Sequence, residues 1–410
     1  RRKCRLLLAQ AKFERTQEDA FNTVNDVISL LSDGDPCKEM ARAYDLLALL
    51  HQGNGQSNDA LEAAEKELAV IDKMGLGSRR ATLRMASLHV DLGKYSLALP
   101  LYEDALAHHL QKERGEVVMK TLRCRSQLVN IYTELGLFDQ AETQARRVIH
   151  VAVTAYKGDI GEEHGSLFDV TKVLVAASRY KEGLALGERN VKLCSASFGA
   201  SLESASALRL FGEAQSCSGM FRKADDSFLG ALEIQEEDGN DVALAVTCAS
   251  VGRSYLREGA VREAYDALQK TVYMTEKIYG SSNVDSLKVQ SDFTIAMVEL
   301  GMTEEALRLA QATVQELNAQ YGDNFPVVAR ARLALARAQI AAGMASEAVD
   351  TVRKAEETLE HIFMAYSKRG IAGELLELTI CHIIVASAML ELNGVEEAFE
   401  RLTAAEEMAG

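Results

Sequence analysis

The sequence predicts an all-α fold, a right-handed α-solenoid of about ten antiparallel helix-turn-helix repeats that forms one domain over residues 1–410. Two observations predict it. A small residue recurs at steps of 38 to 50 positions, and seven of these residues follow a glycine by five positions. The composition agrees, because helix-forming residues dominate and only 3 prolines and no tryptophan occur. The phased small residues are Ala20, Ala60, Ala98, Ala141, Gly183, Ala224, Ala264, Ala306, Ala348 and Ala398.

Each repeat is predicted to contain two helices, and residues 281–320 show the plan. Apolar residues recur at helical spacing up to Gly301, which ends the first helix because glycine adopts left-handed backbone angles without strain. Thr303 is predicted to cap the second helix. Ala306 is predicted to lie where the two helices cross, since a larger side chain there would force them apart. The predicted helix pairs are 1–14 with 17–31, 37–53 with 57–73, 79–92 with 95–112, 116–135 with 138–156, 165–177 with 180–197, 202–218 with 221–236, 241–258 with 261–279, 284–300 with 303–320, 326–342 with 345–366, and 371–392 with 395–409.

Three connections depart from the average repeat. Residues 157–165 are predicted to form a longer loop, and the last step of 50 residues predicts a longer helix near 355–366. The acidic segment 236–241 is predicted to be a turn between helices and not a calcium loop, because it lacks the remaining ligand spacing.

A solenoid normally closes with a polar capping helix. None follows the last predicted helix, so we expect the chain to continue or that face to pack on a partner.

Charge and cysteine content limit the classes of partner. The net charge is −15, which argues against general binding to nucleic acid. No apolar stretch approaches the length of a membrane span. The seven cysteines are scattered singly, which is typical of unpaired thiols in the cytoplasm or another reducing compartment. The chain begins with Arg1, so import into an organelle stays open.

The sequence shows no constellation of catalytic or metal-binding residues. None of the eight histidines has the spacing of a zinc motif. His108 and His109 are adjacent, so on a helix they point about 100° apart. No phosphate-binding glycine loop occurs either. We therefore expect no enzyme activity, no cofactor and no metal.

Several repeats resemble the tetratricopeptide repeat. The matching residues are Gly252, Tyr255, Gly259 and Ala264 in the seventh repeat, Gly212, Gly219, Phe221, Ala224, Phe228 and Ala231 in the sixth, and Gly93, Tyr95, Ala98, Tyr102 and Ala105 in the third. The longer period and the aromatic-glycine pairs 198–199, 279–280 and 321–322 are similar to the kinesin light chain type of repeat. Gly183 and Gly187 replace alanine in the fifth repeat, and the first two repeats lack the aromatic residues. The heptad region that binds kinesin heavy chain is absent from the sequence, so motor association does not carry over.

The resemblance implies that the first helices line a concave groove. Positions 18, 15, 11, 8 and 7 residues before each phased residue would then face inward. These positions hold 13 basic residues but only 6 acidic ones. The basic residues are Arg2, Arg5, Lys12, Arg42, Arg80, Arg123, Lys172, Arg209, Arg253, Arg257, Lys288, Arg330 and Arg337, and the acidic ones are Asp45, Asp91, Glu134, Glu213, Glu299 and Glu391.

A net basic groove would attract an extended acidic peptide. The candidate contact residues are Arg80, Arg123, Asn130, Lys172, Arg209, Arg253, Arg257, Lys288, Arg330 and Arg337. Kinesin light chain repeats bind acidic, aromatic-containing peptides, so the resemblance agrees. The other interpretation is that these cations pair with carboxylates of neighbouring helices.

Two functions stay open. The chain is either a protein-interaction adaptor that binds an acidic partner segment in the groove, or a constitutive subunit of a large multiprotein assembly. A subunit of that kind would be held by its edges and outer face.

Overall fold

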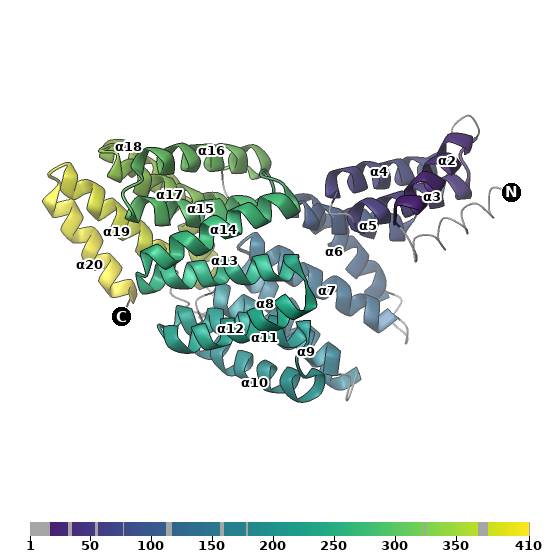
Figure 1. Cartoon of the computed structure of the whole chain (residues 1–410), viewed down its shortest axis with the longest axis horizontal. Helices are drawn as coiled ribbons and strands as arrows, with labels where there is room; N and C mark the ends of the chain where they lie inside the picture. Colours follow the sequence, from purple (N-terminus) through teal and green to yellow (C-terminus); the bar gives the residue numbers. More distant parts are fainter. Residues whose placement is uncertain are drawn as a thin grey trace. The chain divides into compact units, whose positions relative to one another are not determined.

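The computed structural model describes residues 17–31, 35–53, 56–76, 78–111, 117–155, 160–177, 179–323, 325–367 and 376–409. These residues form nineteen α-helices and no strand, so the all-α repeat fold is confirmed (Figure 1). The chain divides into two compact units, Arg1–Cys124 and Arg125–Gly410. The prediction of one continuous solenoid over all 410 residues stays a prediction.

Unit 1 contains consecutive helices that pack against their neighbours in the chain. Its core gathers apolar residues such as Leu50, Ala60 and Leu88, which are fully buried. Its helices are α2 (Gln17–Leu31), α3 (Lys38–Gly53), α4 (Ser57–Lys73), α5 (Arg79–Asp91) and α6 (Tyr95–Gln111), and α7 (Val117–Glu134) contains the boundary between the units.

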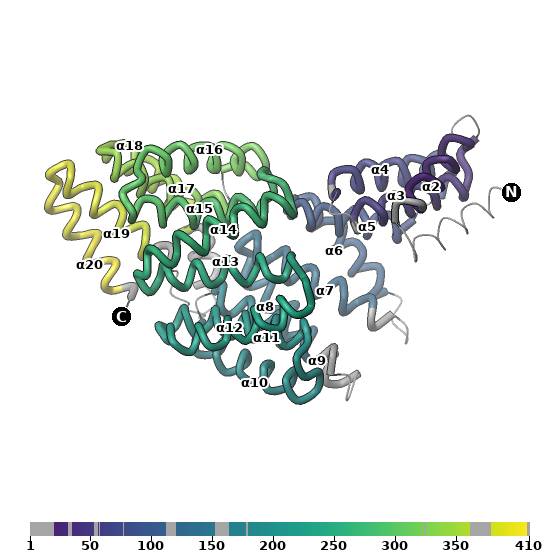
Figure 2. The backbone as a smooth tube through the Cα atoms, viewed as in Figure 1, coloured from purple at the N-terminus to yellow at the C-terminus, as the bar shows by residue number. Residues whose placement is uncertain are grey.

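Unit 2 contains the same alternation of helices, which Figure 2 draws as a tube. Odd-numbered helices are the first helices of their repeats and even-numbered ones the second. First helices also contact the first helices of neighbouring repeats, as α11 does with α9 and α13. The helices are α8 (Phe138–Ala155), α9 (Ile160–Ala176), α10 (Tyr180–Phe198), α11 (Leu202–Cys217), α12 (Phe221–Asp238), α13 (Asp241–Glu258), α14 (Val261–Tyr279), α15 (Val284–Glu299), α16 (Thr303–Tyr321), α17 (Pro326–Ala341), α18 (Ala345–Ser367), α19 (Leu376–Glu391) and α20 (Val395–Ala409).

The phased small residues lie at the helix crossings, as predicted. All nine phased alanines have an exposed fraction of 1% or less. Contacts across the crossing are tight: a Cβ added to Gly252 of α13 would lie 2.6 Å from Leu268 Cγ of α14. The small residue on each helix therefore leaves room for a larger one on its partner.

Six of the glycines that precede phased residues lie in the described ranges, and they end the first helices with positive φ. Gly301 has φ 79°, and the next residue, Met302, donates its N–H to the carbonyl of Met297. This hydrogen bond closes the helix end and turns the chain directly into α16. Asn393 occupies the same position before Ala398 with φ 60°, and asparagine is one of the few other residues that tolerates this conformation.

Two local predictions were wrong. Thr303 is the first residue of α16 and Met302 occupies the cap position without a side-chain hydrogen bond. The turn after Gly301 is one residue shorter than predicted, which explains the difference. Helix α9 begins at Ile160, inside the predicted loop 157–165. Gly161 and Gly165 suggested a loop, but a glycine inside a helix costs only about 1 kcal/mol, which does not prevent helix formation.

Two other local predictions, a long helix and an acidic turn, are confirmed. Helix α18 is 23 residues long and ends at Ser367, as the long last step predicted. The acidic segment 236–241 is a turn, in which Gly239 ends α12 and Asn240 accepts a hydrogen bond from Ala243 N–H at the start of α13. The first predicted helix, 1–14, lies outside the described residues.

Candidate functional site

Glu134, at the end of α7, is surrounded by cations from later repeats of unit 2. Lys172 of α9 donates to Glu134 Oε1 at 3.3 Å and to Asn130 Oδ1 at 2.5 Å. Lys288 of α15 donates to Glu134 Oε2 at 2.7 Å. Burial acts to raise the pKa of Glu134, but the charges of Lys288 and Lys172 outweigh it and hold that pKa below its usual value. Arg330 of α17 adds to this lowering.

The pair of Glu134 and Lys288 shows that the first helices of unit 2 curve around a concave face. Three first helices, α9, α11 and α13, lie between α7 and α15 in the chain order. Neighbouring packed helices are about 8–10 Å apart, so a flat row would separate α7 from α15 by about 35 Å. The two side chains meet at 2.7 Å, which requires strong curvature.

A second carboxylate cluster lies on α11, α13 and α15. Arg209 donates to Glu213 Oε1 at 2.8 Å, and Arg253 lies between Glu213, at 3.4 Å, and Asp292 Oδ2, at 3.5 Å. Ser250 also donates to Glu213. Burial acts to raise the pKa of Glu213, but Arg209 and Arg253 lower it on balance. Burial raises the pKa of Asp292, and Arg253 offsets this only in part.

Of the remaining predicted cations of unit 2, Arg257 belongs to the same surface, and Arg337 pairs apart from it. Arg257 donates to Ser216 Oγ at 3.5 Å, and its charge acts on Glu213 and Asp292. Arg337 of α17 lies 3.9 Å from Glu299 Oε1 of α15. We call this surface the first-helix face, and define it by Lys172, Arg209, Arg253, Arg257, Lys288 and Arg330.

A small open hollow of about 260 Å³ lies on α7, α9 and α11. It is lined by Ser126, His164, Phe168, Asp169 and Ser206, among others. Burial raises the pKa of Asp169 to about 6, although Ser126 hydrogen-bonds to this carboxylate. The Arg209 guanidinium lies 5.8 Å from the centre of the Phe168 ring, so a cation and an aromatic ring stand side by side here.

The sequence argument missed one inward position, 14 residues before each phased residue. Asp169, Ser250 and Asp292 occupy it in unit 2, and Arg84 occupies it in unit 1. On a helix this position lies on the same side as positions 18, 11 and 7, so the spacing alone could have found it. Including it adds two carboxylates to unit 2, and the first-helix face is therefore less basic than the sequence count indicated.

The predicted groove residues of unit 1 that are described either pair within that unit or are exposed. Arg80 donates to Asp45 Oδ2 at 3.2 Å, and Arg84 pairs with the same carboxylate. Burial, with the nearby Asp45 charge, raises the pKa of Glu67 to about 7. Arg42 and Arg123 are exposed. Arg2, Arg5 and Lys12 lie outside the described residues.

Buried Cys194 lies beside a histidine, as a nucleophilic cysteine does, but its thiol is neither accessible nor readily ionised. Its Sγ lies 3.0 Å from His164 Nδ1, and the same nitrogen lies 3.0 Å from Asn190 Oδ1. Cys194 is fully buried, and burial raises the pKa of its thiol to about 11. A reactive cysteine needs an accessible thiolate, so this cluster serves to hold α9 against α10.

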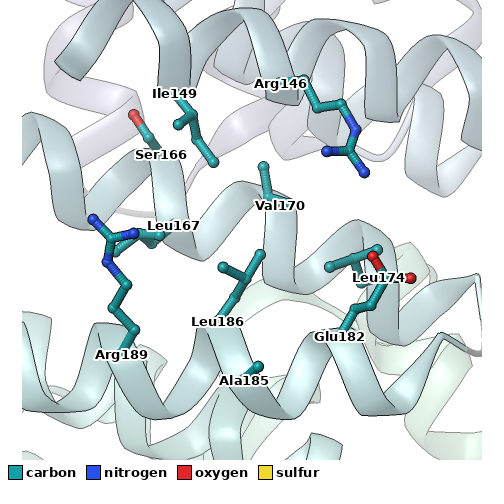
Figure 3. Close-up of a pocket in the computed structure, with 10 residues that line it drawn as sticks. All are labelled: Arg146, Ile149, Ser166, Leu167, Val170, Leu174, Glu182, Ala185, Leu186 and Arg189. Atoms are coloured by element: carbon teal, nitrogen blue, oxygen red, sulfur yellow. The ribbon is translucent and has the colours of Figure 1, made fainter.

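A cavity of about 380 Å³ opens between α8, α9 and α10 (Figure 3). Its walls are mainly apolar, and the charged groups at its edge include Arg146 and Glu182. These two are paired with Glu142 and Arg179. The cavity offers apolar surface without a pair of groups suited to acid–base chemistry.

The described residues offer no metal site and no membrane-spanning helix. No group of three or more metal-ligating side chains is suited to a metal ion in these ranges. No described helix is both long and apolar enough to span a membrane. The six cysteines in the described part of the chain form no disulfide with one another.

Comparison with known families supports the repeat assignment. Residues 121–164 match the tetratricopeptide repeat profile. A comparison with curated protein sequences finds no match. The tetratricopeptide repeat prediction is thus confirmed by this profile together with the all-α repeat fold.

One solved structure, with a TM-score of 0.54, agrees with this fold, and two others share a weaker likeness. A Rap protein complexed with Competence and Sporulation Factor is 13% identical, with a TM-score of 0.54 over 90% of this chain and 99% of that chain. The nearly identical TPR-like repeats of a Podosopora anserina kinesin light chain-type protein are 20% identical, with a TM-score of 0.38 over 50% of this chain and 96% of that chain. A third structure, BtubC (BKLC) from P. vanneervenii, is 12% identical, with a TM-score of 0.41 over 56% of this chain and 91% of that chain. At these identities the likeness concerns the fold alone.

Proposed function

We propose that this tetratricopeptide repeat protein is a non-catalytic interaction scaffold whose first-helix face binds an extended acidic segment of a protein partner. Tetratricopeptide repeats generally mediate contacts between proteins. The observation that carries the finer proposal is the run of six cations over five successive first helices, α9 to α17. Each of them lies at an inward position of its repeat, so an extended chain can reach them in succession.

The internal carboxylates compete with such a partner and therefore limit its affinity. Glu134, Glu213 and Asp292 already contact Lys172, Lys288, Arg209 and Arg253. These pairs support the proposal, because arginine and lysine hold a carboxylate at hydrogen-bonding distance at these positions. A partner's Glu or Asp side chains would exchange with the internal ones. The net gain in free energy is then modest, and binding is sensitive to salt.

A labelled peptide of alternating Glu and Ser residues with one Tyr is a suitable probe, with Lys in place of Glu as its control. We expect the acidic peptide to bind and its affinity to fall about tenfold between about 50 mM and about 300 mM salt. The double variant Arg253→Glu, Arg257→Glu should abolish binding, since it reverses two charges at the centre of the face.

The matched control reverses two charges elsewhere. Arg262 and Arg308 are exposed on the second helices α14 and α16. The variant Arg262→Glu, Arg308→Glu changes the net charge by the same amount and should bind the acidic peptide with nearly unchanged affinity. Equal loss in both double variants would mean that net charge alone attracts the peptide, and unchanged binding in the first would remove the proposed site.

A second candidate function is a constitutive subunit of a larger assembly. One observation favours it: large apolar side chains are exposed on the last helix pair, among them Val395 at 63% and Phe399 at 72%. Purification of the native protein in a stoichiometric complex that survives high salt would favour this function over peptide exchange.

A further inference from the structure

The cavity between α8, α9 and α10 has apolar walls and a charged rim. Leu167, Val170 and Leu174 of α9 form its floor and are at most 3% exposed. Ile149 of α8 and Leu186 of α10 form its sides, and both point toward Val170 in Figure 3. Its volume of about 380 Å³ is more than twice that of an apolar cavity of about 150 Å³ that holds benzene. The cavity is therefore large enough to enclose the apolar part of a small molecule.

A small residue leaves this cavity open at the surface. Ala185 lies on the rim, two positions after the phased Gly183. Alanine does not extend across the opening between α8 and α10, as a longer side chain would. The following four repeats carry charged residues at this position, namely Asp226, Asp266, Arg308 and Asp350. The opening is thus a feature of this repeat, and it lies inside unit 2 with described helices on both sides of it.

Arginines outnumber carboxylates among the described groups at the rim. Arg146 of α8 donates from Nε and Nη2 to Glu142 Oε1, at 2.9 and 2.5 Å. Arg179 pairs with both Glu142 and Glu182. Arg189 of α10 lies on the opposite side of the cavity from Arg146 (Figure 3). These five groups together carry one more positive charge than negative.

The Arg146 guanidinium retains donors for a ligand. A guanidinium has five N–H donors, and Arg146 contacts Glu142 through Nε and Nη2. Its Nη1 group therefore keeps two donors, and the side chain is 60% exposed. A carboxylate at the mouth of the cavity can accept these N–H groups while the chain attached to it lies against the apolar floor.

We propose that this cavity binds a small amphiphilic carboxylic acid, with its apolar part between Val170 and Leu186 and its carboxylate at Arg146 and Arg189. Burial of the apolar part removes it from water. The two guanidinium groups select the charge, because a cationic headgroup would meet the excess of positive charge and a neutral one would form no ion pair. None of the lining residues belongs to the first-helix face, so this site is additional to the proposed partner site.

Octanoate, 1-octanol and octylamine test the charge of the headgroup, because they share one apolar chain. Isothermal titration calorimetry of each compound with the full chain measures its affinity. Octanoate should bind at least about tenfold more tightly than the other two. Equal binding of the three compounds, or no binding of octanoate, would overturn the proposal.

Two exposed residues test the position of the site. Ala185→Phe puts a ring into the opening and should weaken octanoate binding at least about tenfold. Ala312→Phe on α16 is the matched control, because Ala312 is also exposed and lies outside the lining, so binding should stay unchanged. Undiminished binding in Ala185→Phe, with its fold verified by circular dichroism, would place the ligand elsewhere and overturn the proposal.

The charge at the rim is tested separately. Arg189→Gln should lower the affinity for octanoate several-fold and leave that for 1-octanol unchanged, since the apolar walls stay intact. Arg262→Gln on α14 removes an exposed arginine outside the lining and should change neither affinity. An equal effect of both substitutions on octanoate would show that net charge, and not the rim of this cavity, selects the carboxylate, which would contradict the proposal.

Discussion

Lys288 Nζ contacts Glu134 Oε2 at 2.7 Å, although 154 residues separate them in the chain. The contact joins the first helices of the fourth and eighth repeats across the concave face of unit 2. This ion pair therefore helps to hold the curvature of that face. A partner carboxylate that bound Lys288 would compete directly with Glu134.

Loss of this ion pair should loosen the face. Lys288→Met removes one of the two lysines that hydrogen-bond to Glu134, and we expect it to lower the free energy of unfolding by about 1–3 kcal/mol. The radius of gyration from small-angle X-ray scattering should rise as the curvature relaxes. Lys270→Met removes an exposed lysine from α14. It should change the free energy of unfolding by less than about 0.5 kcal/mol and leave the radius of gyration unchanged. Identical stability and size in both variants would mean that the ion pair does not hold the curvature.

Asp169 predicts a pH dependence of stability. Its folded-state pKa of about 6 lies above the usual value of 3.8 for an aspartate. The folded state therefore binds this proton more tightly, and the contribution of Asp169 becomes less favourable as the pH rises from about 4 to about 6. Asp169→Asn removes the charge and keeps an acceptor for Ser126. It should stabilise the protein by about 1–3 kcal/mol at pH above about 7, and by much less near pH 4.

Urea unfolding of the wild type and of Asp169→Asn at several pH values measures this difference. Taking the difference between the two proteins removes the contributions of other titrating groups that the substitution leaves unchanged. A stabilisation that does not vary with pH would show that burial does not shift the pKa of this carboxyl group.

Two glycines in neighbouring helices should respond to alanine in opposite directions. In Gly252→Ala the new methyl group would lie 2.6 Å from Leu268, so we expect a loss of about 1–3 kcal/mol. A Cβ at Gly230 of α12 meets only Leu208 Cδ1, at 3.4 Å. Gly230→Ala should stabilise the helix by about 0.5–1 kcal/mol through its higher propensity. Chemical denaturation of both variants checks the signs, and a loss in both would contradict this account.

The phased Ala264 should not accept a larger side chain. It has no exposed surface at the crossing of α13 and α14, and Ala264→Leu should destabilise the protein by about 1–3 kcal/mol. Ala312→Leu on α16 is the matched control, because Ala312 is exposed. Thermal unfolding should separate the two variants by several degrees. Equal melting temperatures would show that the repeat register is wrong.

The local features of the fold could be predicted from the sequence because they repeat. Each repeat needs a small residue at its helix crossing, and most need a residue with positive φ five positions earlier. Ala264 and Gly259 satisfy these needs in one repeat, and Ala398 with Asn393 satisfies them in another. The exact start of a helix is less regular: Met302 takes the cap position predicted for Thr303, and α9 begins at Ile160 although it contains Gly161 and Gly165.

The pairing on the first-helix face was harder to predict. The sequence count omitted the position of Asp169 and Asp292, although helical spacing places both on the inward side. The contact of Lys288 with Glu134 was beyond such reasoning. It depends on the accumulated rotation between four repeats, and the repeat period contains no information about that rotation.

The central claim is that a partner's acidic segment exchanges with the carboxylates of the first-helix face. The affinity of the labelled Glu/Ser peptide for Glu213→Gln, compared with the wild type, tests this claim most directly. Glu213 contacts Arg209 and Arg253, so its neutral replacement removes an internal competitor and leaves both arginines in place. We expect the peptide to bind several-fold more tightly to the variant, with a steeper dependence on salt. Unchanged or weaker binding would contradict the exchange of internal for partner carboxylates.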